Sequence, residues 1–137
     1  MGRTIGEPRE GAKRYMGLQG RRTRWPWGCA DLHELVGPDT AVAVVEGAID
    51  AVSFNALCAR HGVDCIAVAI PGADTWRDTW ADLARGRNAV VALDADKAGV
   101  LHTERIKASL ARAALSVTIR APARGKDWND VLCTEAA

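Results

Sequence analysis

Three Val-rich apolar runs constrain the fold of this chain more than any other feature. They read AVAVVE from residue 41, CIAVAI from residue 65 and NAVVALD from residue 88. Continuous runs of this length are typical of strands buried on both faces of a parallel sheet, whereas a strand with one wet face alternates apolar and polar residues. A fourth, half-exposed strand is expected at SVTIR from residue 116.

The segments between these runs favour helices. The first is expected over residues 50–60, with Val52, Ala56 and Ala59 near one face. The second is expected over residues 74–84, N-capped by Asp74 or Thr75, with Trp76, Trp80 and Leu83 on one face. The third is expected over residues 98–115, with four residues facing inward: Ile106, Leu110, Ala113 and Ala114. A short fourth helix is expected at DWNDVL from residue 127.

Strands and helices therefore alternate along the chain. This order predicts an α/β fold with about four parallel strands flanked by helices on both faces. The length of 137 residues corresponds to about one domain. We expect this domain to span residues 40–137, preceded by an irregular basic segment, rich in Gly and Arg, over residues 1–39.

The charge is distributed unevenly. Residues 1–24 hold seven basic and two acidic side chains, a balance of +5, which leaves −4 for residues 25–137 of a chain whose net charge is +1. A basic segment attached to an acidic body indicates a polyanion partner held near a site that binds cations, and a solvated arm is the alternative. In RWPWG, Trp25 and Trp27 are expected to cap the core, with stacking on nucleic-acid bases as the alternative.

Neither a membrane segment nor a metal-binding cysteine motif stands out. No apolar run approaches the roughly 18 residues of a membrane-spanning helix, and the Arg-rich N-terminus lacks the apolar region of a secretory signal. We therefore expect a cytoplasmic protein with no membrane partner.

The cysteines show no CxxC pair and no zinc-ligand spacing with the histidines, so we interpret them as buried or incidental thiols: Cys29, Cys58, Cys65 and Cys133.

Acidic residues stand where the predicted strands end. Glu46 closes the first run, Asp94 and Asp96 close the third, and Asp50 follows Glu46 by about one helical turn. Ligands of open parallel sheets bind beyond the carboxyl ends of the strands, so these acids are expected to converge at one edge. Carboxylates crowded together repel one another unless a cation joins them, and a hard divalent ion such as Mg²⁺ fits oxygen ligands. The alternative is that each acid is a helix N-cap.

Two motifs extend this pattern into a family resemblance. The sequences EGAID and DADKAG, separated by about 45 residues, resemble the Glu and DxD signature of the Toprim domain. That domain has a Rossmann-like parallel sheet and occurs in bacterial-type primases, topoisomerases, OLD-like nucleases and RecR-like proteins. The resemblance covers about residues 40–135. EGAIDAVS, DADKAG and GKDWNDVL are most similar to the corresponding segments of bacterial, phage and plasmid primases.

The resemblance implies which residues act. Glu46, Asp94 and Asp96 would be catalytic, and Lys97 and Lys126 would contact nucleotide phosphates or template. Asn129 stands where replicative primases have a second acid, with Asp130 next to it as a substitute. The implied ligands of Mg²⁺ or Mn²⁺ are Glu46, Asp50, Asp94, Asp96 and Asp127.

The function implied by the primase resemblance is Mg²⁺-dependent nucleotidyl transfer that makes RNA primers. The partners would be a single-stranded DNA template, NTPs and a replicative helicase. Residues 1–40 contain only one cysteine, so the zinc module of complete primases is missing, and the chain is expected to be a fragment, a split gene product or a minimal protein. A metal-dependent OLD-like nuclease and a non-catalytic RecR-like DNA-binding module are the alternatives.

Overall fold

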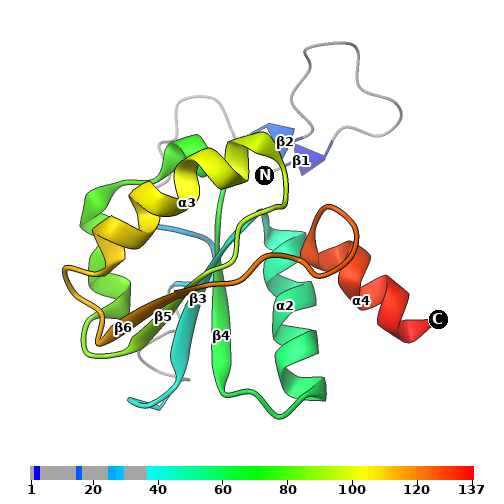
Figure 1. The fold of residues 1–137 in the computed structure, drawn as a ribbon, viewed down its shortest axis with the longest axis horizontal. Helices are drawn as coiled ribbons and strands as arrows, with labels where there is room; N and C mark the ends of the chain where they lie inside the picture. Colours follow the sequence, from blue (N-terminus) through cyan, green and yellow to red (C-terminus); the bar gives the residue numbers. More distant parts are fainter. Residues whose placement is uncertain (1, 4–14, 17–24, 30–36) are drawn as a thin grey trace.

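The computed structural model describes residues 2–3, 15–16, 25–29 and 37–137. A four-stranded sheet in the order β4-β3-β5-β6 forms the centre, and every neighbouring pair in it is parallel. The fold is therefore the predicted α/β arrangement (Figure 1). Its strands are β3 (Ala41–Glu46), β4 (Cys65–Ile70), β5 (Asn88–Val91) and β6 (Ser116–Ile119), and its helices are α2 (Ala48–Arg60), α3 (Lys97–Leu110) and α4 (Trp128–Ala136), with 3₁₀ segments η1 (Ala73–Thr75) and η2 (Asp78–Ala84).

Most of the predicted basic segment over residues 1–39 lies outside the described residues, so its boundary with the domain at residues 39 and 40 stays a prediction. Within it, β1 (Gly2–Arg3) and β2 (Tyr15–Met16) form a short antiparallel pair. In the part of the chain that is described, no helix is long and apolar enough to cross a membrane.

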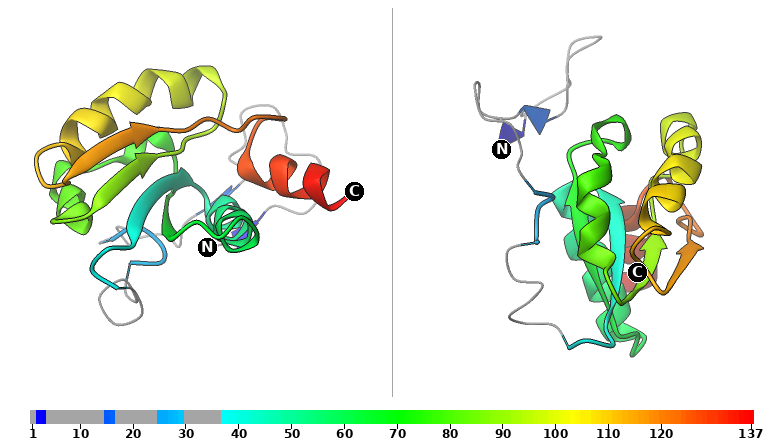
Figure 2. Two further views of the ribbon diagram at one scale, coloured as in Figure 1. Left: turned by 60° about the horizontal axis from the view of Figure 1, so that its bottom comes forward. Right: turned by 90° about the vertical axis from the view of Figure 1, so that its left-hand side faces the viewer.

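The two faces of the sheet bury different side chains. In β3, Val42 and Val44 join a core cluster that includes Trp80 and Ile106, whereas Ala43 and Val45 join a second cluster that includes Phe54. This division follows from the alternation of side chains along a strand. The first cluster lies under α3, η1 and η2, and the second lies under α2 and α4 (Figure 2).

The apolar face predicted for α2 is not the face that it buries. Val52, Ala56 and Ala59 are exposed, and the buried positions are Ala51, Ser53, Phe54, Leu57 and Cys58. Phe54 and Leu57 face the core, whereas Ile49 and Val52 stay exposed. Alanines offer little surface to bury, so the spacing of Ala56 and Ala59 does not decide the buried face.

The segment after β4 is also not the predicted α-helix. It forms η1 and η2, and between them Trp76 and Arg77 have extended backbone with ψ of 134°. Neither Asp74 nor Thr75 acts as a side-chain N-cap; the Thr75 hydroxyl donates instead to the Gly72 carbonyl. Trp76 and Trp80 are still buried, as their spacing predicted, with their rings edge to face at 5.9 Å.

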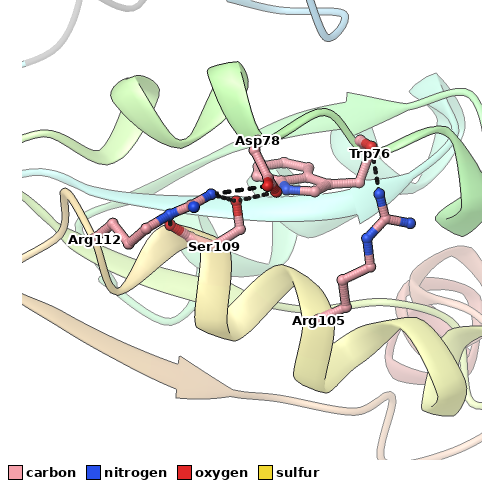
Figure 3. A network of polar contacts seen from close by, with 5 residues as sticks. All are labelled: Trp76, Asp78, Arg105, Ser109 and Arg112. Atoms are coloured by element: carbon pink, nitrogen blue, oxygen red, sulfur yellow. Dashed lines mark hydrogen bonds and ion pairs between the residues drawn. The ribbon is translucent and has the colours of Figure 1, made fainter.

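A polar network fixes this irregular segment to α3 (Figure 3). Ser109 donates to the Asp78 carboxylate at 2.9 Å, and Arg112 lies 3.1 Å from the same carboxylate. Arg105 donates to the Trp76 carbonyl at 3.2 Å, where the backbone is extended. Tertiary hydrogen bonds from α3 thus replace the i to i−4 bonds of the expected helix, which local sequence spacing could not indicate. They also lower the pKa of Asp78, first through Ser109 and then through Arg112.

Two of the aromatic side chains are placed differently from the prediction. Trp25 and Trp27 were expected to cap the core, but 49% and 47% of their surfaces are exposed. Trp27 is instead held by its backbone, which exchanges two hydrogen bonds with Ala69 in β4. Trp27 therefore forms an antiparallel bridge to the outer edge of β4, within a turn that the Cys29 N–H closes by donating to the Pro26 carbonyl at 3.4 Å.

The cysteines were interpreted as buried or incidental thiols: Cys29 and Cys58 are buried, Cys65 is half-buried and Cys133 is exposed, and all four are free. Burial raises the pKa of Cys29, and chiefly burial raises that of Cys65, in both cases to about 12. A thiol that stays protonated is a poor nucleophile, so burial does not activate either of these two.

Ile106 and Leu101 test the assignment of the two sides of α3. Ile106 is fully buried, so Ile106→Ala is expected to lower the free energy of unfolding by about 2–5 kcal/mol, because it leaves a cavity under the helix. Leu101 is 74% exposed, and Leu101→Ala should change stability by less than about 0.5 kcal/mol. Urea unfolding measures both, and equal losses in the two variants would contradict the packing described above.

Candidate metal centre

The candidate site lies at the carboxyl ends of β3 and β5. Glu46 is the last residue of β3, and it continues the alternation of Val42 and Val44 toward the face covered by α3 and η1. Gly47 then turns the chain into α2 with a φ of 75°, which favours glycine. This turn places Asp50 in the first turn of α2.

Asp94 and Asp96 lie on the loop that joins β5 to α3. Asp96 is the N-cap of α3, and its side chain accepts a hydrogen bond from the Gly99 N–H at 2.7 Å. The loop folds closely against the start of the helix: a Cβ added at Gly99 would stand 2.1 Å from the Asp94 carbonyl oxygen. The glycine of DADKAG is therefore required by this close approach, which holds Asp94 and Asp96 at the end of the sheet.

The GKDWND segment brings the fifth acid to the same place. Asp127 is the N-cap of α4 and accepts from the Asp130 N–H at 2.8 Å. The Ala95 N–H donates to the Lys126 carbonyl at 3.0 Å, so the loops before α3 and α4 lie side by side. One carboxylate oxygen of Asp50 accepts from the N–H groups of Trp128 and Asn129, at 3.1 and 3.3 Å, which ties the start of α2 to the start of α4.

Trp128 is a positioning residue to which sequence reasoning assigned no role. Its indole N–H donates to the Ala92 carbonyl at 2.7 Å, just beyond the end of β5, and its ring meets Phe54 of α2 edge to face at 4.8 Å. The side chain therefore locks the start of α4 onto both β5 and α2. The signal was present in DWND, where a tryptophan stands between two acids at a helix start.

The acids affect one another electrostatically. Burial, followed by the charges of Glu46, Asp50, Asp127 and Asp96, raises the pKa of Asp94 to about 7. Burial and then the charge of Asp127 raise the pKa of Asp50 to about 6. Burial and then the charge of Asp96 raise that of Glu46, against the lowering effect of the Ala73 and Asp94 backbone N–H groups. The structure thus brings all five predicted acids together at one rim, hereafter the acidic rim: Glu46, Asp50, Asp94, Asp96 and Asp127.

Two oxygens of the acidic rim are poised for a cation. Glu46 Oε1 and Asp94 Oδ1 are buried, and neither has a hydrogen-bond partner among the residues described. A buried, unpaired carboxylate oxygen is unfavourable in a protein, and a divalent ion satisfies it. Glu46 and Asp94 are therefore the acids that fit Mg²⁺ best.

The remaining acids have other roles in the fold. The N-cap alternative is confirmed for Asp96, and Asp127 is an N-cap as well. One oxygen of Asp50 is occupied by backbone N–H groups. Within the described part of the chain, no three acidic, His or Cys side chains already surround a metal position. Mg²⁺ is commonly held by one or two carboxylates together with waters and substrate phosphates. The rim fits that mode of binding, in which Asp50, Asp96 and Asp127 would contribute through the waters of a bound ion.

The predicted phosphate contacts flank this rim. Lys97 is the first residue of α3 and Lys126 precedes the N-cap of α4, and both are exposed. Asp130, the predicted substitute for a second acid, accepts a hydrogen bond from the Lys126 N–H at 2.8 Å and so stabilises its own loop. Asn129 accepts one from the Ser53 hydroxyl at 3.3 Å.

An open parallel α/β sheet with acids at the carboxyl ends of its strands defines the class of Rossmann-like domains with an acidic site. Residues 43–132, more than half of the chain, match the Toprim-like family. The chain belongs to this family, whose domains are metal-dependent phosphoryl-transfer modules and generally catalytic. No curated protein and no solved structure matches the chain.

Asp94 predicts an unusual pH dependence of stability. Its pKa of about 7 in the folded state lies above the usual value near 3.9, so between these values the native state binds the extra proton. In EDTA the free energy of unfolding should therefore fall as the pH rises from about 4 to about 7, and Glu46 and Asp50 act in the same direction. Asp94→Asn should flatten this slope and be more stable than the wild type at the upper end. A wild-type stability that rises over this range would contradict the prediction.

Gly99 predicts a steric effect. Gly99→Ala should separate the start of α3 from the Asp94 loop and lower the free energy of unfolding by about 1–3 kcal/mol. Gly37→Ala is the matched control, because a Cβ there meets its nearest neighbour, the Thr40 hydroxyl, at an ordinary 3.8 Å. Thermal unfolding in EDTA compares the two, and an unchanged midpoint for Gly99→Ala would disprove the close approach.

Proposed function

We propose that this chain is the catalytic domain of a primase-like protein, which joins NTPs into short RNA primers on single-stranded DNA with Mg²⁺ or Mn²⁺. One observation carries the proposal: Glu46 Oε1 and Asp94 Oδ1 are buried and unpaired among the described residues, at a rim where three further acids meet. The motifs EGAIDAVS, DADKAG and GKDWND resemble those of primases, and this resemblance supports primer synthesis over the other activities of the family.

In the proposed reaction, the 3′-hydroxyl of the growing primer attacks the α-phosphorus of an NTP and pyrophosphate leaves. A bound divalent ion supplies two things there, a lower pKa for the attacking hydroxyl and compensation of the phosphate charge. Glu46 and Asp94 would hold the ion, and Asp96, Asp50 and Asp127 would orient its waters. Glu46 would accept the hydroxyl proton only if it does not bind the ion, because metal binding would lower the pKa that a general base needs.

Lys97 and Lys126 would bind the phosphate groups that the carboxylates of the acidic rim repel. Lys97 and Lys126 are exposed beside the acidic rim, where the triphosphate of an NTP would lie. Their charge would also lower the repulsion between the rim and the phosphates of a template. The basic balance of residues 1–24 supports single-stranded DNA as the polyanion partner. A replicative helicase as a further partner rests on the primase resemblance alone.

Primer synthesis from labelled NTPs on single-stranded DNA tests this function. With Mg²⁺ or Mn²⁺, and with a helicase added where needed, the wild type should make short RNA, and EDTA should abolish the product. Asp94→Asn should lower the rate by at least about 100-fold, the order expected for losing one electrostatic contact to the transition state. Asp64→Asn is the matched control, since Asp64 is exposed next to the start of β4, at the opposite end of the sheet.

Other outcomes would contradict primer synthesis. Cleavage of the DNA without NTPs, lost in Asp94→Asn, would indicate the nuclease. Binding of DNA that survives EDTA and Asp94→Asn, without any chemistry, would indicate the RecR-like module.

A further inference from the structure

The two exposed indoles are not used by the acidic rim, although they lie next to it. Trp25 and Trp27 line a pocket of about 180 Å³ together with Gly47, Ala48, Ala69, Ile70 and Pro71. Gly47 directly follows Glu46, and Ile70 ends β4, so the pocket opens at the same carboxyl edge of the sheet as the acids. We call the pocket and its two indoles the indole pocket.

The indole pocket is held in place by the backbone. The Trp27 N–H donates to the Ala69 carbonyl at 2.8 Å, and the Ala69 N–H donates to the Trp27 carbonyl at 3.0 Å. Pro26 and Cys29 are buried, whereas Trp25 and Trp27 are about half exposed. Both indoles line the pocket, and the pairing of Trp27 with Ala69 anchors the segment that carries them.

This exposure is specific to these two tryptophans. Trp76 and Trp80 are each only 2% exposed, which shows that the fold has room to bury indoles. A large apolar ring left half in water next to a pocket marks a binding surface, and indoles are enriched where a flat ligand stacks.

We propose that the indole pocket binds one unpaired base of a single-stranded nucleic acid whose backbone passes the acidic rim. The pocket is smaller than the roughly 300–1,000 Å³ of sites for whole small molecules, so it suits a single ring system. Aromatic side chains stack on bases of any sequence, and basic side chains next to them hold the phosphates. Arg21, Arg22 and Arg24 directly precede Trp25 in the sequence, which favours a nucleic-acid strand over an apolar peptide. The proposal rests on the proposed function only in naming the strand as the template.

An abasic oligonucleotide tests the proposal without any variant. It has the same length and phosphate charge as a poly-dT strand but lacks bases, so it retains the electrostatic part of binding. Fluorescence anisotropy at fixed salt in EDTA should show roughly 5- to 100-fold tighter binding of the strand with bases. Equal affinity for the two strands would overturn the proposal.

Variants assign the preference to the indoles. Trp25→Ala combined with Trp27→Ala should remove the preference for bases but leave the salt dependence unchanged, because stacking releases no counterions. Trp27→Phe should retain part of it. Leu101→Ala combined with Leu115→Ala removes two exposed apolar side chains elsewhere and should leave the preference intact. A preference that persists in the double tryptophan variant would place the base elsewhere.

Two further measurements separate binding of a strand from binding of an incoming nucleotide, and the indole pocket from the proposed function. If free NTP competes with the strand and the competition depends on the indoles, the pocket binds the incoming nucleotide and the assignment to the strand is wrong. Asp94→Asn should keep the base preference while it loses synthesis. A protein that makes no primer yet prefers strands with bases would thus disprove the proposed function and leave the indole pocket standing.

Discussion

The repulsion among five carboxylates at one rim is the constraint on which the rest of the structure depends. Burial and mutual repulsion raise the pKa of Asp94 to about 7 and that of Asp50 to about 6, so the site is strained in its ionised form. A protein gains nothing for its own stability from such an arrangement. The strain is understandable when a divalent ion and a phosphate-bearing substrate complete the site.

The fold resists this repulsion with many local devices. β3 and β5 end at the same edge of the parallel sheet, which places Glu46 and the Asp94 loop next to each other. Three helices, α2, α3 and α4, begin at this edge. Asp96 and Asp127 are tied down as N-caps, where helix dipoles favour their negative charge. Glycine at position 99 and the indole N–H of Trp128 bring the loops close enough to share one site. Stability is thus provided by groups next to the acids, which leaves Glu46 and Asp94 unpaired among the described residues.

The sequence predicted what depends on strong local patterns. The Val-rich runs indicated the parallel sheet, and acids at strand ends indicated the rim. Expectations failed where tertiary contacts decide: Phe54 set the buried face of α2, and hydrogen bonds from α3 to Asp78 and Trp76 replaced an α-helix with 3₁₀ segments. Trp25 and Trp27 were expected to cap the core but are about half exposed. The sequence could not show this, because the position of the segment depends on the backbone hydrogen bonds between Trp27 and Ala69.

The central claim is that Glu46 and Asp94 hold a divalent ion at the acidic rim. The most direct measurement is a crystal structure of the protein with Mn²⁺, with the ion located by its anomalous scattering. The account predicts a peak at about 2.0–2.3 Å from Glu46 Oε1 and Asp94 Oδ1, close to the Mg²⁺–oxygen distance. A peak bound only elsewhere, or no peak at the rim while both carboxylates stay unpaired, would contradict it.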